Sequence, residues 1–184
     1  MSVPHRIYRL RNYLVSPPLI FAFALNDYEI EADWLIWPLG VVIVLVGIAL
    51  RVWGQQHLHY RVGVRKQLTT TGPYQFIRNP LYIGNIMMCV GATIASELLW
   101  LIPITIFWCI GIYSIVIRYE EGHLLEKYRD GYRRYLLEVP RWFPKGLNFK
   151  YMGLINRHLC RVASIELSGV LILLPYVFKE ILYL

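Results

Sequence analysis

An apolar run at residues 34–53 constrains this chain more than any other feature. The run is 20 residues long, a tryptophan stands at each end, and the first charge within it is Arg51. A helix rises roughly 1.5 Å per residue, so about 20 residues cross the hydrocarbon core of a bilayer, and tryptophan favours the two interfaces. The run therefore predicts a membrane span. Composition agrees, because 57% of the residues are hydrophobic and only 17% are charged.

Three further apolar stretches have the composition of spans: 81–96, 98–117 and 162–178. The first stretch, 7–25, is a weaker candidate, and we include it because without it Arg6, Arg9 and Arg11 would lie outside. Glu97 divides 81–96 from 98–117, which predicts a hairpin. Pro17 and Pro18 predict a kink in the first stretch, because proline interrupts helical hydrogen bonding. We therefore expect an all-α integral membrane bundle of about five spans, forming a single domain over 1–184.

The placement of lysine and arginine supports this topology. With the N-terminus inside, 18 of the 19 basic residues fall on one side, and only Lys179 falls on the other. The first outer loop, 26–33, holds four carboxylates and no basic residue. Because cytoplasmic loops are enriched in basic residues, we expect the basic side to face the cytoplasm. From the lack of a clean apolar core followed by a small-residue cleavage site, we expect no removable signal peptide.

Residues 120–139 predict a helix of another kind. Leucines and tyrosines recur there every three or four residues, and charged residues occupy the opposite face. Such a pattern is typical of an amphipathic helix at the cytoplasmic surface. Val139–Pro140 should end it, because the residue before a proline leaves the helical region.

The composition argues against two other functions. The net charge of +7 is explained by basic residues near anionic headgroups, and no nucleic-acid module is visible. His57 and His59 are two residues apart and would diverge on a helix, so we expect no metal site. The three cysteines form no CxxC pair, and they are expected to be buried free thiols.

The most distinctive segment is 71–84, which contains the turn signals Gly72–Pro73 and Asn79–Pro80. Pro80 suits the first turn of the following span, whose positive dipole end faces the same place. Arg78 is costly to bury in a membrane unless it meets an anion. It is either such a functional arginine or an anchor that reaches the interface.

Glu120 and Glu121 form a second polar group where the fourth span meets the surface helix. Adjacent carboxylates repel each other, so at least one should have a basic or hydroxyl partner, and Arg78 and Arg118 are the candidates. Alternatively, the two carboxylates complement the dipole of a helix N-terminus.

Five motifs in this order resemble the isoprenylcysteine carboxyl methyltransferase family and related phospholipid methyltransferases. The resemblance covers residues 50–144. The motifs are Gly72–Pro73–Tyr74, Arg78–Asn79–Pro80–x–Tyr82–x–Gly84, Glu120–Glu121–x–x–Leu124, Tyr132–x–x–Tyr135 and Val139–Pro140.

The resemblance implies S-adenosylmethionine as cofactor and an active site at the cytoplasmic face of a bacterial inner membrane. It implies catalytic roles for Arg78 and Glu120. The implied cofactor-binding residues are Lys66, Gln67, Leu68, Thr69, Tyr74, Asn79, Pro80, Leu81, Tyr82 and Glu120. Arg78 would orient an anionic group near the reacting methyl, and a carboxylate such as Glu120 suits the amino group, ribose or sulfonium of the cofactor.

The sequence departs from the family pattern at several positions. Asn79 and Lys66 stand where the family often has histidine, and asparagine cannot titrate near neutral pH. The usual Phe-Gly pair is Tyr128–Arg129 here, with the glycine displaced to Gly131. These departures bear on the substrate more than on the cofactor.

The function expected from the sequence is methyl transfer to a membrane-associated or lipophilic acceptor, a carboxylate, amine or thiol. Two alternatives stay open. One is an NADPH-dependent membrane reductase of sterol-reductase-like architecture, which carries a similar Arg-His-Pro motif. The other is a non-catalytic membrane protein, which Asn79 would favour.

Overall fold

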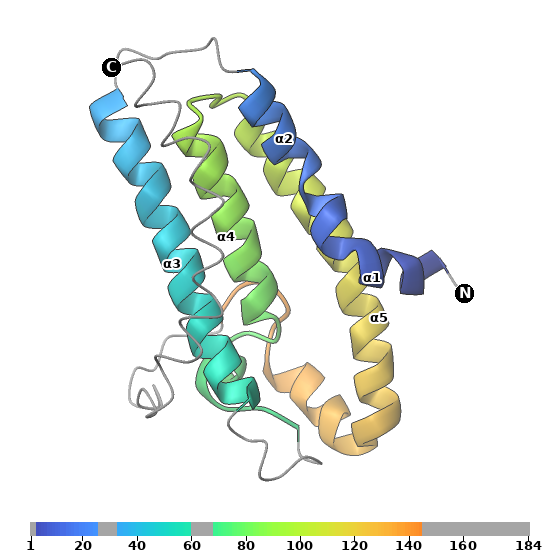
Figure 1. Cartoon of the computed structure of the whole chain (residues 1–184). Coiled ribbons are helices and arrows are strands. Elements are labelled where there is room, and N and C mark those ends of the chain that lie inside the picture. The colour runs from blue at the N-terminus through green and yellow to red at the C-terminus, as the bar shows by residue number, and fades with distance from the viewer. Residues whose placement is uncertain (1–2, 26–32, 60–67, 145–184) are drawn as a thin grey trace.

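The computed structural model describes residues 3–25, 33–59 and 68–144, and all regular structure in these ranges is helical. The elements in chain order are α1 (Val3–Val15), α2 (Pro17–Ala24), α3 (Asp33–His59), the short 3₁₀ helix η2 (Gly72–Gln75), α4 (Pro80–Ala95) and α5 (Leu101–Glu138). Figure 1 shows α3, α4 and the first part of α5 running side by side, with α1 and α2 lying along α5.

Two short helices replace the first predicted span. The break falls at Ser16, directly before Pro17, and the Ser16 hydroxyl donates a hydrogen bond to the Tyr13 carbonyl over 2.8 Å. The kink predicted from the two prolines therefore lies where α1 meets α2. Helix α1 is tied to α5 by Trp108, whose Nε1 donates to the Leu14 carbonyl over 2.7 Å.

Helices α3 and α4 form the most extensive helix pair in the described structure. Glycines bring the two backbones together: a Cβ atom added to Gly91 would lie 2.6 Å from the carbonyl oxygen of Gly40. One added to Gly47 would lie 2.7 Å from the carbonyl oxygen of Gly84. Small residues allow such close approach between helices in membranes, where water does not drive association. The packing of α3 on α4 thus fixes the position of the first turn of α4.

The predicted hairpin between α4 and α5 is present. Glu97 adopts a φ of 65° in the turn, and the carboxyl half of α4 packs on the start of α5. Inside the hairpin, the hydroxyls of Thr93 and Thr105 are 3.2 Å apart and both side chains are fully buried.

Helix α5 differs from the predicted arrangement of a span followed by a separate surface helix. It continues without interruption past residue 117, and its only non-helical residue is Arg129, with φ 44° and ψ −116°. The expected amphipathic segment is therefore an extension of the span that bends at Arg129. Figure 1 shows the last turns of α5 folding back toward the ends of α3 and α4.

Two of the described helices are long and apolar enough to cross a membrane, within Leu35–Leu58 and Leu101–Glu138. Helix α4 is apolar but shorter. The predicted count of about five spans is not confirmed by these elements, and the predicted span at 162–178 lies outside the described residues.

Candidate active site

The 3₁₀ helix η2 places Tyr74 at the site. Gly72 begins η2 with a φ of +63°, and a Cβ atom there would lie 2.3 Å from the ring of His57 on α3. Only glycine combines this backbone conformation with such a close neighbour. The turn predicted at Gly72–Pro73 therefore packs directly on α3, and it leaves Tyr74 buried.

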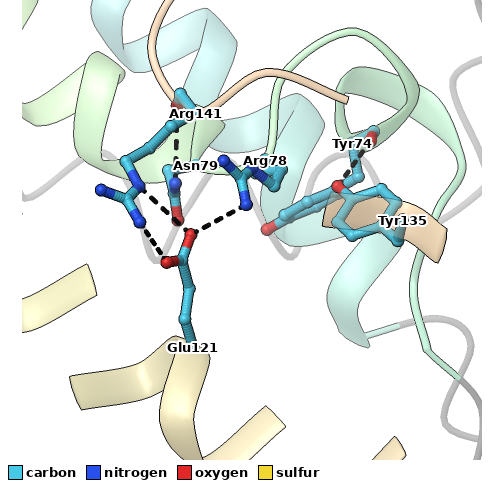
Figure 2. Close-up of polar contacts among 6 residues, drawn as sticks. All are labelled: Tyr74, Arg78, Asn79, Glu121, Tyr135 and Arg141. Carbon is cyan, nitrogen blue, oxygen red and sulfur yellow. Dashed lines mark hydrogen bonds and ion pairs between the residues drawn. The ribbon is translucent and has the colours of Figure 1, made fainter. Parts of the chain in front are cut away.

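The segment after α5 returns to this turn. The Tyr135 hydroxyl donates a hydrogen bond to the Tyr74 carbonyl over 2.6 Å, as Figure 2 shows. Tyr132, Tyr135 and Val139 are buried in one cluster, against which Leu68 packs. The bend at Arg129 makes this return possible, and the spacing of Tyr132 and Tyr135 gives both side chains the inward face.

The Arg78–Asn79–Pro80 turn is held by the same returning segment. The Arg78 amide donates to the Pro140 carbonyl over 3.0 Å, and Asn79 Nδ2 lies 3.5 Å from the Arg141 carbonyl. Pro80 occupies the first turn of α4, where a missing amide hydrogen costs nothing. The two motifs around Asn79 and Pro140, which are 61 residues apart in sequence, thus hold each other.

Glu121 joins two arginines at this point (Figure 2). Its carboxylate lies 3.3 Å from Arg78 Nη1, and it also pairs with Arg141 through Nη2 and, over 3.3 Å, through Nε. The side chains of Arg78 and Glu121 are each only 13% exposed. Charges buried to this degree are stable only when paired and hydrogen-bonded. Of the two partners proposed for the adjacent carboxylates, Arg78 is one, whereas Arg118 is exposed.

Glu120 has a different partner. The Tyr82 hydroxyl on α4 donates a hydrogen bond to Glu120 Oε1 over 2.8 Å. The ring of Tyr82 packs on Tyr113 with centroids 4.8 Å apart, which fixes the direction of the hydroxyl. The two adjacent carboxylates are therefore separated in role: Glu121 holds arginines together, and Glu120 faces Tyr82.

Two buried polar atoms at the site have no hydrogen-bond partner among the described residues. They are the Tyr74 hydroxyl and Arg78 Nε. Burial also raises the pKa of Tyr74 well above its ordinary value, so this hydroxyl stays protonated and can donate. Because buried polar groups are rarely left unpaired, these atoms mark places where a ligand could bind.

A cavity of about 660 Å³ lies among these side chains. Its volume is within the range of small-molecule and cofactor sites. The lining residues come from α1, α3, η2, α4 and α5: His5, Tyr8, Arg11, Asn12, Arg51, Gln55, Leu58, Tyr74, Arg78, Asn79, Pro80, Leu81, Tyr82, Asn85, Tyr119, Glu120, His123 and Leu124.

The segments that line this cavity lie largely within a region that matches a known protein family. Residues 35–131, more than half of the chain, match the family described as phospholipid methyltransferase. The chain belongs to the phospholipid methyltransferase family. This family includes proteins like isoprenylcysteine carboxyl methyltransferase, so the resemblance carried by the motifs is confirmed. The match extends from α3 to the bend in α5 and includes both polar motifs that converge at the cavity.

Two curated relatives share about the same region. The nickel-cobalt-cadmium resistance protein NccN of Alcaligenes xylosoxydans xylosoxydans is 34% identical over 58% of this chain and 47% of the relative. The cobalt-zinc-cadmium resistance protein CzcN of Cupriavidus metallidurans is 27% identical over 62% of this chain and 53% of the relative. The chain thus spans about half the length of these relatives. No solved structure matches it.

Most of the residues singled out from the family pattern lie at the cavity. Those in its lining are Tyr74, Arg78, Asn79, Pro80, Leu81, Tyr82 and Glu120. Leu68 and Thr69 precede η2 and are not in the lining. Lys66 and Gln67 lie outside the described residues, and their assignment stays a prediction.

Helix α1 contributes a wall of the cavity that the sequence motifs did not predict. His5, Tyr8, Arg11 and Asn12 line the cavity, although they precede the region that matches the phospholipid methyltransferase family. Their spacing contained a signal, because residues three and four apart share one face of a helix. The basic residues of this segment predict the orientation of a span, but they do not by themselves indicate a polar face toward a cavity. Arg51 and Gln55 on α3 were missed as well.

Proposed function

We propose that this protein is an S-adenosylmethionine-dependent methyltransferase that acts on a lipophilic acceptor at the cytoplasmic face of a membrane. One observation carries the proposal. In a chain of a methyltransferase family, a single cavity gathers the Arg78–Asn79–Pro80–x–Tyr82 motif and Glu120, which are about 40 residues apart in sequence.

The residues of the cavity fit the functional groups of S-adenosylmethionine. Its carboxylate suits the amino end of α4, where Asn79 and Pro80 lie and the helix dipole is positive. Its amino group or ribose hydroxyls suit Glu120. The unpartnered Tyr74 hydroxyl supplies a further donor. When bound, the cofactor would supply a methyl group on a positively charged sulfur.

The protein's own contribution would be alignment and the exclusion of water. Holding two reactants in line is worth several kcal/mol of barrier, roughly 7–11 in the best cases. Tyr82 fixes the Glu120 carboxylate, and Glu121 with Arg141 fixes Arg78. We assign Arg78 to orienting an oxygen of the cofactor or the acceptor, because its Nε is buried at the cavity without a partner among the described residues.

The membrane location is part of the proposal. Helix α3 exposes a series of large aliphatic side chains, among them Leu35, Leu39, Val42 and Leu45, which a bilayer would cover. The arginines at the cavity lie at the end of the bundle that the positive-inside rule assigns to the cytoplasm. We propose that an acceptor with an apolar tail reaches the cavity from the adjoining leaflet of a bacterial inner membrane.

The reductase alternative loses support. Membership in a methyltransferase family favours methyl transfer over nicotinamide-dependent reduction. The names of the relatives connect them with resistance to nickel, cobalt, cadmium and zinc. Within the described residues, no three histidine, cysteine or acidic side chains are grouped to hold a metal ion. We therefore propose that any part this chain has in metal resistance runs through methylation of an acceptor.

Thermal unfolding of the full chain in detergent tests the proposal. S-adenosylhomocysteine at 100 times its dissociation constant should stabilise the folded state by about 2.7 kcal/mol, whereas NADPH should not. Stabilisation by NADPH would support the reductase instead. Stabilisation by neither compound at millimolar concentration would overturn the proposal and favour a non-catalytic protein.

A further inference from the structure

The wall formed by α1 brings an imidazole to the cavity. His5 lies in the lining, and its Nδ1 is 2.8 Å from the Tyr119 hydroxyl on α5. Tyr119 is itself packed between Tyr8, with ring centroids 5.5 Å apart, and His123, with centroids 4.5 Å apart. These contacts fix the position of the His5 ring at the cavity.

Methyl transfer to an amine, thiol or alcohol releases a proton, which a nearby group must accept. Glu120 accepts the Tyr82 hydroxyl hydrogen, and the proposed function assigns this carboxylate to the amino group or ribose hydroxyls of the cofactor. Asn79 occupies the family's histidine position and cannot titrate near neutral pH. The Tyr74 hydroxyl is protonated and acts as a donor. The remaining candidates in the described lining are the two imidazoles of His5 and His123.

The two imidazoles differ in their hydrogen bonds. His123 Nδ1 lies 3.0 Å from the Tyr119 carbonyl one helical turn earlier, and its side chain is exposed. His5 is half-buried, and its partner is a hydroxyl from a different helix. In the tautomer that donates from Nδ1 to Tyr119, His5 Nε2 keeps a lone pair that can accept a proton.

We propose that His5 accepts the proton of the methyl acceptor, and that the acceptor is accordingly a lipophilic amine, thiol or alcohol, not a carboxylate. This inference rests on the proposed function. The bond between the acceptor's nucleophilic atom and its hydrogen breaks, and that atom forms the new bond to carbon. The electron pair of the old carbon–sulfur bond stays on sulfur, and the proton goes to His5 Nε2. The positive charge lost at sulfur reappears on the imidazole, so the net charge of the cavity is unchanged.

His5 shares the cavity lining with charged and titratable groups from every element that contributes to it. They are Tyr8 and Arg11 on α1, Arg51 on α3, Tyr74 on η2, Arg78 just before α4, Tyr82 on α4, and Tyr119, Glu120 and His123 on α5. Glu120 is the one carboxylate among these lining residues, and Arg11, Arg51 and Arg78 are the three guanidinium groups.

Four probes with the same alkyl tail test the inference: dodecylamine, dodecanethiol, 1-dodecanol and dodecanoate. The full chain in detergent is given S-adenosylmethionine with a labelled methyl group. We expect transfer to at least one of the first three probes. His5→Gln should lower kcat by about a hundredfold and flatten the acidic side of the pH profile. The control Glu126→Gln, at an exposed position of α5 outside the cavity lining, should stay within about twofold of the wild type.

Two further measurements separate a proton acceptor from a structural residue. With ring-labelled histidines and no cofactor, the probe that is methylated should shift one imidazole resonance, and that resonance should be missing in His5→Gln. Tyr119→Phe keeps the packing with Tyr8 but removes the hydroxyl that positions His5. It should lower kcat by about tenfold and leave S-adenosylhomocysteine affinity within about twofold.

Three results would overturn the inference while leaving the proposed function intact. They are transfer to dodecanoate alone, unchanged kcat in a folded His5→Gln protein, and S-adenosylhomocysteine binding without transfer to any of the first three probes. Failure of S-adenosylhomocysteine to bind would instead overturn the proposed function itself.

Discussion

The two ends of α4 are held by opposite kinds of interaction. Along most of its length, α4 packs on α3 through glycines whose backbones nearly touch and through an apolar cluster that contains Val44, Met88 and Ala95. At its amino end, arginines, carboxylates and tyrosines from segments distant in sequence converge within a few ångströms. Close backbone packing gives a rigid axis, and the polar cluster uses that axis to place Tyr82 and Asn79 at the cavity. Substitutions at the two ends should therefore differ in what they damage.

The largest expected effect lies in the polar cluster. Glu121→Ala leaves Arg78 and Arg141 without their shared carboxylate, and breaking a buried pair costs about 3–5 kcal/mol. The matched control is Glu126→Ala, because Glu126 is exposed on the same helix and should change stability by less than about 0.5 kcal/mol. Chemical denaturation in detergent compares the two variants. Equal, small losses would mean that the arginines do not depend on Glu121.

Arg78→Lys should damage chemistry and spare the fold. Lysine keeps a positive charge for Glu121 but not the planar fork of the guanidinium. We expect methyl transfer to fall by about a hundredfold, the scale of one positioned electrostatic contact, with membrane insertion unchanged. Arg118→Lys, at an exposed position of α5, is the control. Full transfer activity in a folded Arg78→Lys protein would reduce Arg78 to an interfacial anchor.

The scaffold end should respond in the opposite way. Gly91→Ala places a methyl group 2.6 Å from the Gly40 carbonyl oxygen, and the helices must separate. Overpacking of this kind costs about 1–3 kcal/mol of stability. Gly111→Ala is the control, because nothing lies within 4 Å of its added Cβ, and it should stabilise α5 by about 0.5–1 kcal/mol. If both variants behaved alike, the close packing of α3 and α4 would be refuted.

The smallest expected change in stability concerns the bend at Arg129, which returns the end of α5 to Tyr74 and Arg78. Arg129 has φ 44° and ψ −116°, a conformation that glycine adopts far more readily. Arg129→Gly should therefore stabilise the protein by about 1 kcal/mol. Arg133→Gly, in an exposed helical position, should destabilise it by about the same amount. A loss of stability in both variants would argue for a straight α5.

Local patterns were sufficient to predict much of this structure. The length of the apolar stretches predicted the long helices. Pro17 predicted the break before α2, and Glu97 predicted the turn between α4 and α5. Glycine next to proline at Gly72 marked η2, whose positive φ has a local cause. The family motifs also named seven residues that line the cavity.

The remaining features depend on contacts between distant segments, which periodicity does not report. The pairing of Arg141 with Glu121 needs the bend at Arg129. The charged residues around Arg129 do not predict a bend there. The contribution of α1 needs its packing on α5, through contacts such as that of His5 with Tyr119. The periodicity of residues 120–139 likewise predicted a separate surface helix, because it does not show that this segment continues the preceding span.

The central claim, that this cavity holds the methyl donor, is tested most directly by calorimetric titration of S-adenosylhomocysteine. The wild type should bind it, and Glu120→Gln should weaken binding by roughly tenfold to a hundredfold, since a hydrogen bond to a charged group contributes about 1.5–3 kcal/mol. Glu126→Gln, which makes the same change at an exposed position of α5, should bind as the wild type does. Equal affinity in all three proteins would contradict the account, because the ligand would then bind away from Glu120.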